Sequence, residues 1–208
     1  MAKVTFDFDA LTVWRASAYA YRINKQYVKS GENPADKQSN RAIMATAIND
    51  TALITDEDKE LGDAIRKHYQ AYTFKILKGI KLNEFDNNAM LVANRDVIIS
   101  GYELGVIAYL PYGYANETKR NKVDQRIKFA TGGFIGNVGD KVKLNIEIVK
   151  AIFSHKYNTT YVTGLTEKDE PIFFSYHHPI NVGDTHTITG TVKAHRENLT
   201  QINRVKLT

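Results

Sequence analysis

Hydrophobic and polar residues alternate along roughly the last seventy residues of the chain. Period-two alternation bounded by turn residues predicts half-buried β-strands. Five segments have this pattern, and short polar turns separate them: 141–153, 159–165, 171–177, 185–195 and 201–207. Gly190 lies inside the fourth segment, where a closing barrel needs a bulge or a bend. The pattern therefore predicts a small antiparallel β-barrel.

The earlier part of the chain repeats its apolar residues at helical spacing instead. One helix is expected over 10–30. Thr55 and Asp58 have the spacing of a capping box, and a second helix is expected from there to about residue 78. Shorter helices are expected over 41–49 and after Asn83, with a linker-like loop over about 31–40.

Other segments are less regular. Residues 1–10 alternate briefly and predict a short edge strand. Residues 97–110 are ambiguous: 97–99 fit a strand, and 102–110 fit a buried helix that Pro111 would end. A basic helix is expected over 116–130. The expectation is an α+β protein with a mainly helical region over 1–132, followed by a five-stranded antiparallel barrel over 133–208.

Composition narrows the class of protein. The chain has 208 residues, of which 43% are hydrophobic, so a substantial core is available. No apolar run is long enough for a membrane span, and no secretory signal begins the chain. The absence of cysteine excludes disulfides and thiolate sites and favours a cytoplasmic location. A net charge of +5 points weakly to a polyanionic partner.

The C-terminal strands resemble a known family. The carrying residues are Val182-Gly183-Asp184, then Ile188-x-Gly190-Thr191-Val192-Lys193-x-His195-Arg196, then Thr200-Gln201-Ile202-Asn203-Arg204-Val205. The region has five expected strands, and the first is longer than the others. It resembles the OB-fold domains of single-stranded-DNA-binding proteins. The whole chain is similar in style to small phage-type replication and recombination proteins. The resemblance implies an OB-like barrel that binds single-stranded DNA.

In an OB-fold the ligand lies on strands two and three and on the loops beside them. The residues that the resemblance places there are Phe153, His155, Lys156, Tyr157, Tyr161, Phe174 and Tyr176. Phe173 and Phe174 point to opposite faces of their strand, so one of the two belongs to the core. Bases of a single strand stack on such rings without sequence readout. The alternative is that these aromatic side chains only fill the barrel.

A second set of candidates is basic. Five of its members lie on the last two strands and two on the basic helix: Lys193, His195, Arg196, Arg204, Lys206, Lys119 and Arg120. The five on the strands form an expected stripe along the phosphates, although charge on edge strands also prevents aggregation. The basic helix with Lys119 and Arg120 would extend this stripe; the favoured alternative is that its basic face is only solvated. We expect Tyr161, Tyr176 and Lys193 to border one groove.

Catalytic chemistry is not indicated. Five of the six histidines lie in the barrel region, but no carboxylate stands at a metal-ligand spacing from them. Phosphate-loop, nucleophile-elbow and zinc-protease motifs are absent. We therefore expect a non-catalytic protein without a cofactor or metal, which binds single-stranded DNA, with RNA as an open alternative. The other hypotheses are an adaptor for replication or recombination proteins and a metal-dependent nuclease. Oligomeric state stays open.

Overall fold

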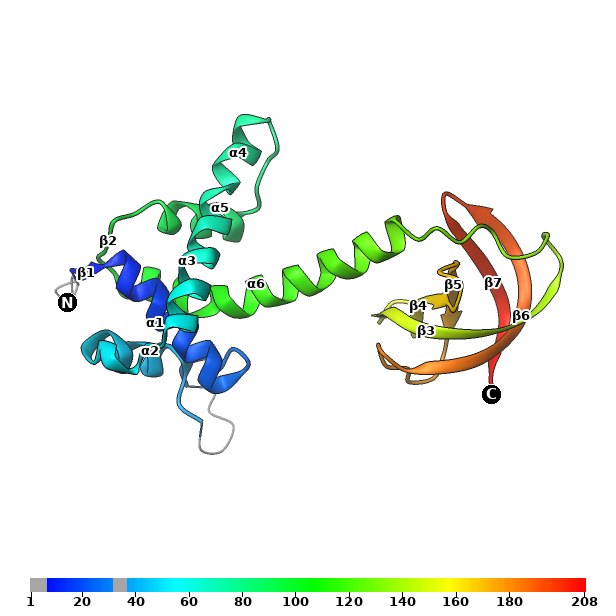
Figure 1. Ribbon diagram of the computed structural model, residues 1–208, viewed down its shortest axis with the longest axis horizontal. Coiled ribbons are helices and arrows are strands. Elements are labelled where there is room, and N and C mark those ends of the chain that lie inside the picture. The colour runs from blue at the N-terminus through cyan, green and yellow to red at the C-terminus, as the bar shows by residue number, and fades with distance from the viewer. Residues whose placement is uncertain (1–6, 32–36) are drawn as a thin grey trace. The chain divides into compact units, whose positions relative to one another are not determined.

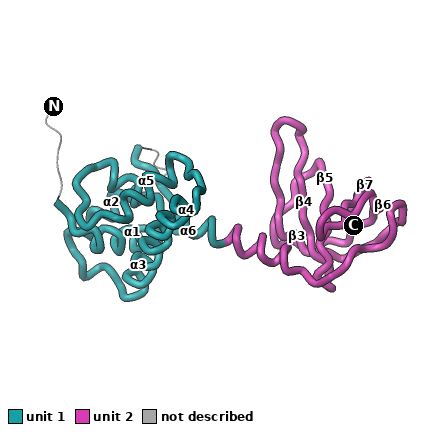
Figure 2. Tube along the Cα trace, turned by 90° about the horizontal axis from the view of Figure 1, so that it is seen from above, with its two compact units in different colours: residues 1–118 teal, residues 119–208 magenta. Residues whose placement is uncertain are grey.

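The computed structural model describes residues 7–31 and 37–208, and these divide into two compact units. Unit 1 covers residues 1–118 and unit 2 covers residues 119–208 (Figure 2). Each unit has its own hydrophobic core. The division falls inside a helix, whereas the sequence placed a boundary after residue 132.

Unit 1 is helical. Its helices are α1 (Ala10–Asn24), α2 (Asn40–Asn49), the short 3-10 helix η1 (Thr51–Leu53), α3 (Asp56–Gln70), α4 (Tyr72–Leu77), α5 (Glu84–Ala93) and α6 (Gly101–Lys128), the last of which continues into unit 2. Two short antiparallel strands, β1 (Phe8–Asp9) and β2 (Val97–Ile98), pair with each other. The edge strand expected near the N-terminus is thus present over residues 8–9. Its expected residues Val4 and Phe6 lie outside the described ranges.

The core of unit 1 forms where α1 crosses α3. Trp14 and Ile65 are fully buried there. Gly62 makes this crossing close, because a Cβ atom at that position would lie 2.8 Å from both Arg15 Cα and the Trp14 carbonyl oxygen. The glycine therefore sets how near the two helix backbones come.

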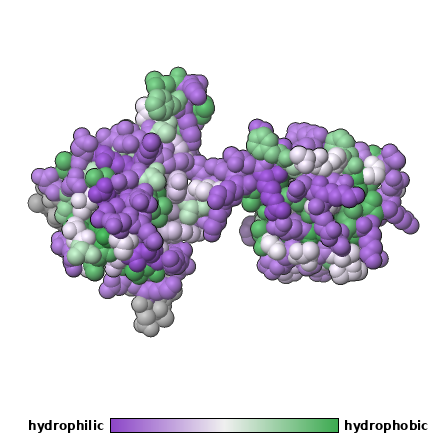
Figure 3. All heavy atoms as spheres, in the orientation of Figure 1, coloured by the Kyte–Doolittle hydropathy of each residue, from purple (hydrophilic) through white to green (hydrophobic). Residues whose placement is uncertain are grey.

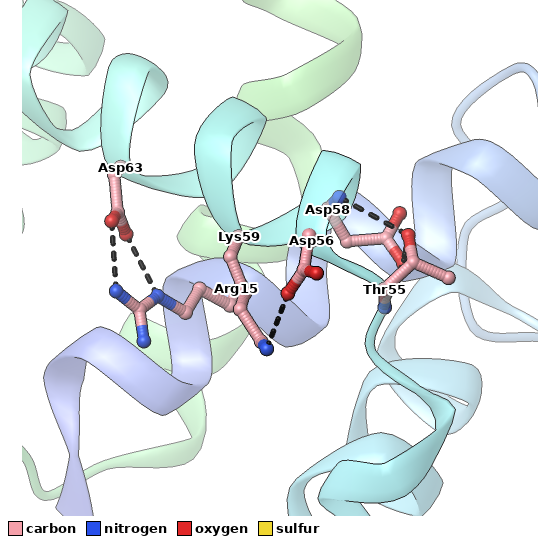
Figure 4. A network of polar contacts seen from close by, with 6 residues as sticks. All are labelled: Arg15, Thr55, Asp56, Asp58, Lys59 and Asp63. Carbon is pink, nitrogen blue, oxygen red and sulfur yellow. Dashed lines mark hydrogen bonds and ion pairs between the residues drawn. The ribbon is translucent and has the colours of Figure 1, made fainter.

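A capping box starts α3, and ion pairs hold this helix against α1. Thr55 and Asp58 form the capping box that their spacing predicts, which is confirmed. The buried Asp58 carboxylate also accepts hydrogen bonds from Arg22 at 2.8 and 2.9 Å. Arg15 donates to both oxygens of Asp63 in the same way (Figure 4). Burial raises the pKa of Asp58, but the hydrogen bonds from Arg22 and Thr55 outweigh it, so the net pKa is lowered.

Several helix boundaries differ from the expectation. The first helix ends at Asn24 and not near residue 30, because Lys25 adopts a left-handed conformation (φ 58°) and caps it. Asn40 then holds the following segment by accepting a hydrogen bond from the Val28 N–H at 2.8 Å. The expected helix over 55–78 is broken after Gln70. Beyond that break Tyr72 is buried, whereas Leu77 is exposed.

The expected helix end at Pro111 is wrong. α6 has 28 residues in all and continues through this proline to Lys128. A proline inside a helix removes one backbone hydrogen bond and crowds the preceding turn. Burial offsets this cost: Pro111 is buried and follows directly on the buried Ile107, Ala108 and Leu110.

Unit 2 contains a closed barrel of five strands. They are β3 (Lys141–Ser154), β4 (Thr159–Thr166), β5 (Pro171–Tyr176), β6 (Thr185–Arg196) and β7 (Leu199–Leu207), close to the five segments expected from alternation (Figure 1). Around the barrel the order is β3-β4-β5-β7-β6, and β3 closes it by pairing with both β4 and β6. This architecture is compatible with an OB-like fold.

The expectation that all strand pairs are antiparallel is wrong. β5 and β7 are parallel, with Ile172 opposite Thr200 and Phe173 opposite Gln201. Directions cannot alternate all the way round a closed ring with an odd number of strands. A closed five-stranded barrel therefore needs at least one parallel pair, and the fold is a mixed barrel.

Two details close the barrel. The register of β6 against β7 shifts between Thr189 and Thr191, which confirms an irregularity at Gly190. A Cβ atom on Gly190 would lie 2.4 Å from Ile202 Cγ2, so only glycine fits. The segment before β3 packs on the barrel: Ile135 is buried in the barrel core and its N–H donates to Thr200 Oγ1 at 3.0 Å.

Candidate nucleic-acid interface

An open groove lies on the outer surface of β3, β4 and β5 in unit 2. Its volume is about 600 Å³. We call it the aromatic groove and define it by its lining residues: Asp124, Ile127, Lys128, Lys150, Ile152, Tyr161, Thr163, Phe173, Glu197, Asn198 and Leu199. Its size suits one small planar ligand at a time or part of a longer chain.

Two rings form the floor of the aromatic groove. Tyr161 and Phe173 are diagonal neighbours on adjacent strands, because Thr163 pairs with Phe173 and Tyr161 pairs with Ser175. Their ring centroids are 6.0 Å apart and their planes differ by 20°. Both side chains are half-buried, so one face of the pair is open to a ligand. Near-parallel, half-exposed rings are the arrangement on which nucleic-acid bases stack.

The C-terminal end of α6, within unit 2, forms one wall of the groove. Arg126 donates two hydrogen bonds to Glu147 at 3.0 and 2.8 Å, and these lower the pKa of the Glu147 carboxyl. Asn198 donates to the Ile127 carbonyl oxygen at 2.9 Å. Lys150 pairs with Asp124 at 2.8 Å. These contacts fix Ile127 and Lys128 beside the rings.

Two of the expected aromatic candidates belong to the interior. Phe174 is completely buried in the barrel core, so it cannot stack on a ligand, and Phe173 is the outward-facing member of that pair. Tyr176 is half-buried and packs edge-on against Phe174 at 6.4 Å. It shares the inward face because alternate residues of a strand point the same way. Choosing Phe174 over Phe173 was therefore wrong.

The hairpin between β3 and β4 carries four of the expected residues. Phe153, His155, Lys156 and Tyr157 are all exposed. Phe153 and His155 meet edge-to-face at 5.0 Å, and the Lys156 amine lies 5.2 Å from the Tyr157 ring centroid. The structure thus presents rings and a cation together at this tip.

The expected basic residues do not form one stripe. Arg204 and Lys206 lie together in a groove on another side of the barrel, described below. Lys193 and Arg196 are exposed on β6 but line none of the described pockets. His195 stacks on Phe134 at 4.5 Å and contacts the Gly136 carbonyl oxygen at 3.1 Å, so it holds the segment before β3.

Lys119 and Arg120 belong to a smaller, mostly apolar groove. They line it with Val123, Ile152 and Val182, among others, and its volume is about 290 Å³.

The expectation that Tyr161, Tyr176 and Lys193 border one groove is wrong. Tyr161 lines the aromatic groove, Tyr176 packs on the core, and Lys193 lies outside both.

Sequence reasoning missed several lining residues. Ile152 and Leu199 line the aromatic groove without having been singled out for it, and Phe173 was considered only as the alternative to Phe174. The pairing register is what brings them together, with Ile152 opposite Tyr161. Alternation does give a signal for Phe173. Successive residues of a strand point to opposite faces, so once Ile172 and Phe174 are placed in the core, Phe173 must face outward. No local signal pointed to Leu199.

The described residues form neither a metal site nor a membrane-spanning helix. In residues 7–31 and 37–208, no three His, Asp or Glu side chains lie close enough to hold a metal ion. None of the helices in these ranges combines the length and apolar character of a membrane span. No protein-family model, curated protein or solved structure matches the chain.

Proposed function

We propose that the barrel of unit 2 binds single-stranded nucleic acid without sequence readout. Bases stack on Tyr161 and Phe173, while Lys128 and Lys150 at the groove edge approach the backbone. The observation that carries the proposal is the near-parallel ring pair, 6.0 Å between centroids, facing outward from β4 and β5. The exposed hairpin tip with Phe153 and Tyr157 lengthens the stacking surface.

The barrel topology supports the same function. An OB-like barrel offers the outer face of its second and third strands to oligonucleotides, and here those strands are β4 and β5. A protein of this kind would act in phage-type DNA replication or recombination by covering unpaired strands. It is not an enzyme in this proposal, and single-stranded DNA is its expected partner.

Fluorescence anisotropy with labelled oligo-dT tests the proposal. We expect binding at low salt that weakens as salt rises, since released counterions contribute to affinity. Tyr161→Ala and Phe173→Ala should each weaken binding by about 1–3 kcal/mol, or roughly 5- to 150-fold. Tryptophan quenching is not a suitable readout, because the one tryptophan, Trp14, is fully buried in unit 1.

The matched control is Phe74→Ala, which removes an exposed ring from unit 1. It should leave affinity unchanged. An absence of oligo-dT binding by the wild type at low salt would end the proposal. Equal losses in the groove variants and the control would show that stacking in this groove is not the binding mode.

A second candidate function has its own supporting observation. Four large apolar side chains are exposed on α4 and the turn after it: Phe74, Ile76, Leu77 and Ile80. Figure 3 shows hydrophobic atoms gathered there. Exposed apolar groups of this kind mark interaction sites. They favour a protein-interaction adaptor whose partner is a helicase, polymerase or nuclease.

A pull-down distinguishes the adaptor hypothesis from the nucleic-acid-binding hypothesis. In a pull-down with such a replication protein, the adaptor hypothesis expects retention by the wild type and loss with the double variant Phe74→Gln/Leu77→Gln. It also expects no shift of an oligonucleotide. Oligonucleotide binding that survives the double variant unchanged would support the nucleic-acid function instead.

A further inference from the structure

A second groove lies on the outer surface of β3, β6 and β7. Its volume is about 510 Å³. We call it the basic groove and define it by its lining residues: Lys141, Val142, Lys143, Thr189, Gly190, Thr191, Arg204 and Lys206. Half of these residues are cationic, and none is acidic or aromatic.

The strand register explains how the cations meet. Lys143 and Lys206 both pair with Thr189, from the two sides of β6. Lys141 pairs with Thr191 one step along the same face. Arg204 joins them because it adopts a left-handed backbone conformation (φ 54°) near the register shift of β7. The groove is therefore built by pairing and not by chance proximity on loops.

The charge of this groove is not balanced by the protein. Within the described ranges, none of the four cations has an ion pair with a carboxylate. Lys143 also borders a shallow depression that contains Glu167 and Glu170, so it is the least isolated of the four. Cations gathered in one groove without carboxylates raise its electrostatic potential and repel one another. An external anion would relieve this repulsion.

The chemistry of the lining selects the kind of anion. Lysine, arginine and threonine hydroxyl groups suit phosphate oxygens, and the absence of rings gives bases nothing to stack on. We propose that the basic groove binds the phosphodiester backbone of the same nucleic acid whose bases enter the aromatic groove. This inference rests on the function proposed above and adds a second contact region to it.

The distance between the two grooves sets the length of ligand that reaches both. Lys150 lines the aromatic groove and Lys141 the basic groove, nine residues apart on β3. A strand rises about 3.3 Å per residue, so the separation along it is at most about 30 Å. One strand of a duplex covers that length in about nine nucleotides at its rise of about 3.4 Å, and an extended single strand covers it in fewer. The backbone can come from further single strand or from a flanking duplex.

The test compares three labelled ligands with one charge variant. The ligands are an oligo-dT of about three nucleotides, which is too short to reach both grooves, one of about twenty, and the short oligo-dT joined to a duplex of about fifteen base pairs. The variant is Lys141→Gln/Lys206→Gln in the full chain. The control is Lys122→Gln/Lys168→Gln, which removes the same charge from exposed positions outside both grooves. Anisotropy is measured over a range of salt concentrations.

We expect the variant to bind the short oligo-dT as the control does. On a longer ligand its affinity should fall about tenfold, with the slope of log K against log salt reduced by about 1.5–2. A loss on the long oligo-dT identifies single strand as the source of the backbone. A loss confined to the joined ligand identifies the duplex.

Other outcomes overturn the inference. Equal affinity of variant and control on all three ligands removes it while leaving the proposed function intact. An equal loss on the short oligo-dT shows a general charge effect and also removes it. A wild type that binds none of the ligands ends the proposed function and this inference together.

Discussion

At the residue scale, Gly62 decides how closely α1 and α3 pack. Any side chain there collides with backbone atoms of Trp14 and Arg15 at 2.8 Å. We expect Gly62→Ala to destabilise unit 1 by about 1–3 kcal/mol, because two helix backbones must separate. Gly105→Ala in α6 is the matched control. No atom lies within 4 Å of its added Cβ, so it should stabilise by about 0.5–1 kcal/mol.

Urea unfolding followed by the emission of Trp14 measures both changes, since this tryptophan lies in the unit 1 core. Equal midpoints for the two alanine variants would contradict the close crossing of α1 and α3.

Asp58 combines a cap and an ion pair in one buried carboxylate. We expect Asp58→Ala to cost about 2–4 kcal/mol at neutral pH, because Arg22 and the start of α3 both lose their partner. Asp56→Ala, which removes an exposed carboxylate of the same turn, should change little.

The contribution of Asp58 depends on pH in a defined direction. Its pKa in the folded protein is lowered from 3.8, so the unfolded chain binds the proton more readily. The stabilisation by the ionised Asp58 carboxylate is fully present above the ordinary pKa of 3.8. It is lost as the pH falls through the lower pKa that this group has in the folded protein. Unfolding curves of wild type and Asp58→Ala should therefore converge in acid. A gap that stays constant down to that range would exclude this role.

At the element scale, α4 presents its large apolar residues outward. Phe74 is 65% and Leu77 is 76% exposed, whereas Tyr72 is buried and donates to Glu117 at 3.0 Å. We expect Phe74→Gln/Leu77→Gln to change the free energy of unfolding by less than about 0.5 kcal/mol. Tyr72→Ala should cost about 3 kcal/mol because it leaves a cavity and removes a hydrogen bond to Glu117, which keeps its contact with His68.

Urea denaturation again gives both values. If the double variant destabilised as much as Tyr72→Ala, the two side chains would be packed against the unit and not available to a partner.

The elements also show what a sequence can reveal. Alternation located all five barrel strands, since each has one face in the core and one in solvent. Alternation cannot tell which strands pair, and the site depends on pairing. The ring pair needs Thr163 opposite Phe173, and the basic groove needs Lys143 and Lys206 on either side of Thr189.

Two errors have general causes. Pro111 was expected to end a helix, because local rules omit the burial that offsets its cost. The all-antiparallel barrel could have been rejected from the strand count alone, since five strands cannot alternate around a closed ring. By contrast, Thr55 and Asp58 were predicted correctly because a capping box is a local interaction.

At the scale of the whole molecule, the remaining question is where the nucleic-acid-binding part begins. The barrel core contains residues from Ile135 onward, which agrees with a boundary after residue 132. The aromatic groove, however, uses Asp124, Ile127 and Lys128 from the end of α6, and Arg126 ties this segment to Glu147. The binding unit should therefore begin at residue 119 and not at residue 133.

Two fragments distinguish these boundaries. We expect residues 119–208 to bind oligo-dT as tightly as the full chain, because every residue of both grooves is retained. Residues 133–208 keep both rings and the whole basic groove but lose one wall of the aromatic groove. Their affinity should fall by about tenfold, or about 1.4 kcal/mol, while the salt dependence from the basic groove persists. Anisotropy measures both, and circular dichroism melting checks that each fragment is folded. Equal affinity of two folded fragments would show that α6 only borders the site and contributes nothing to binding.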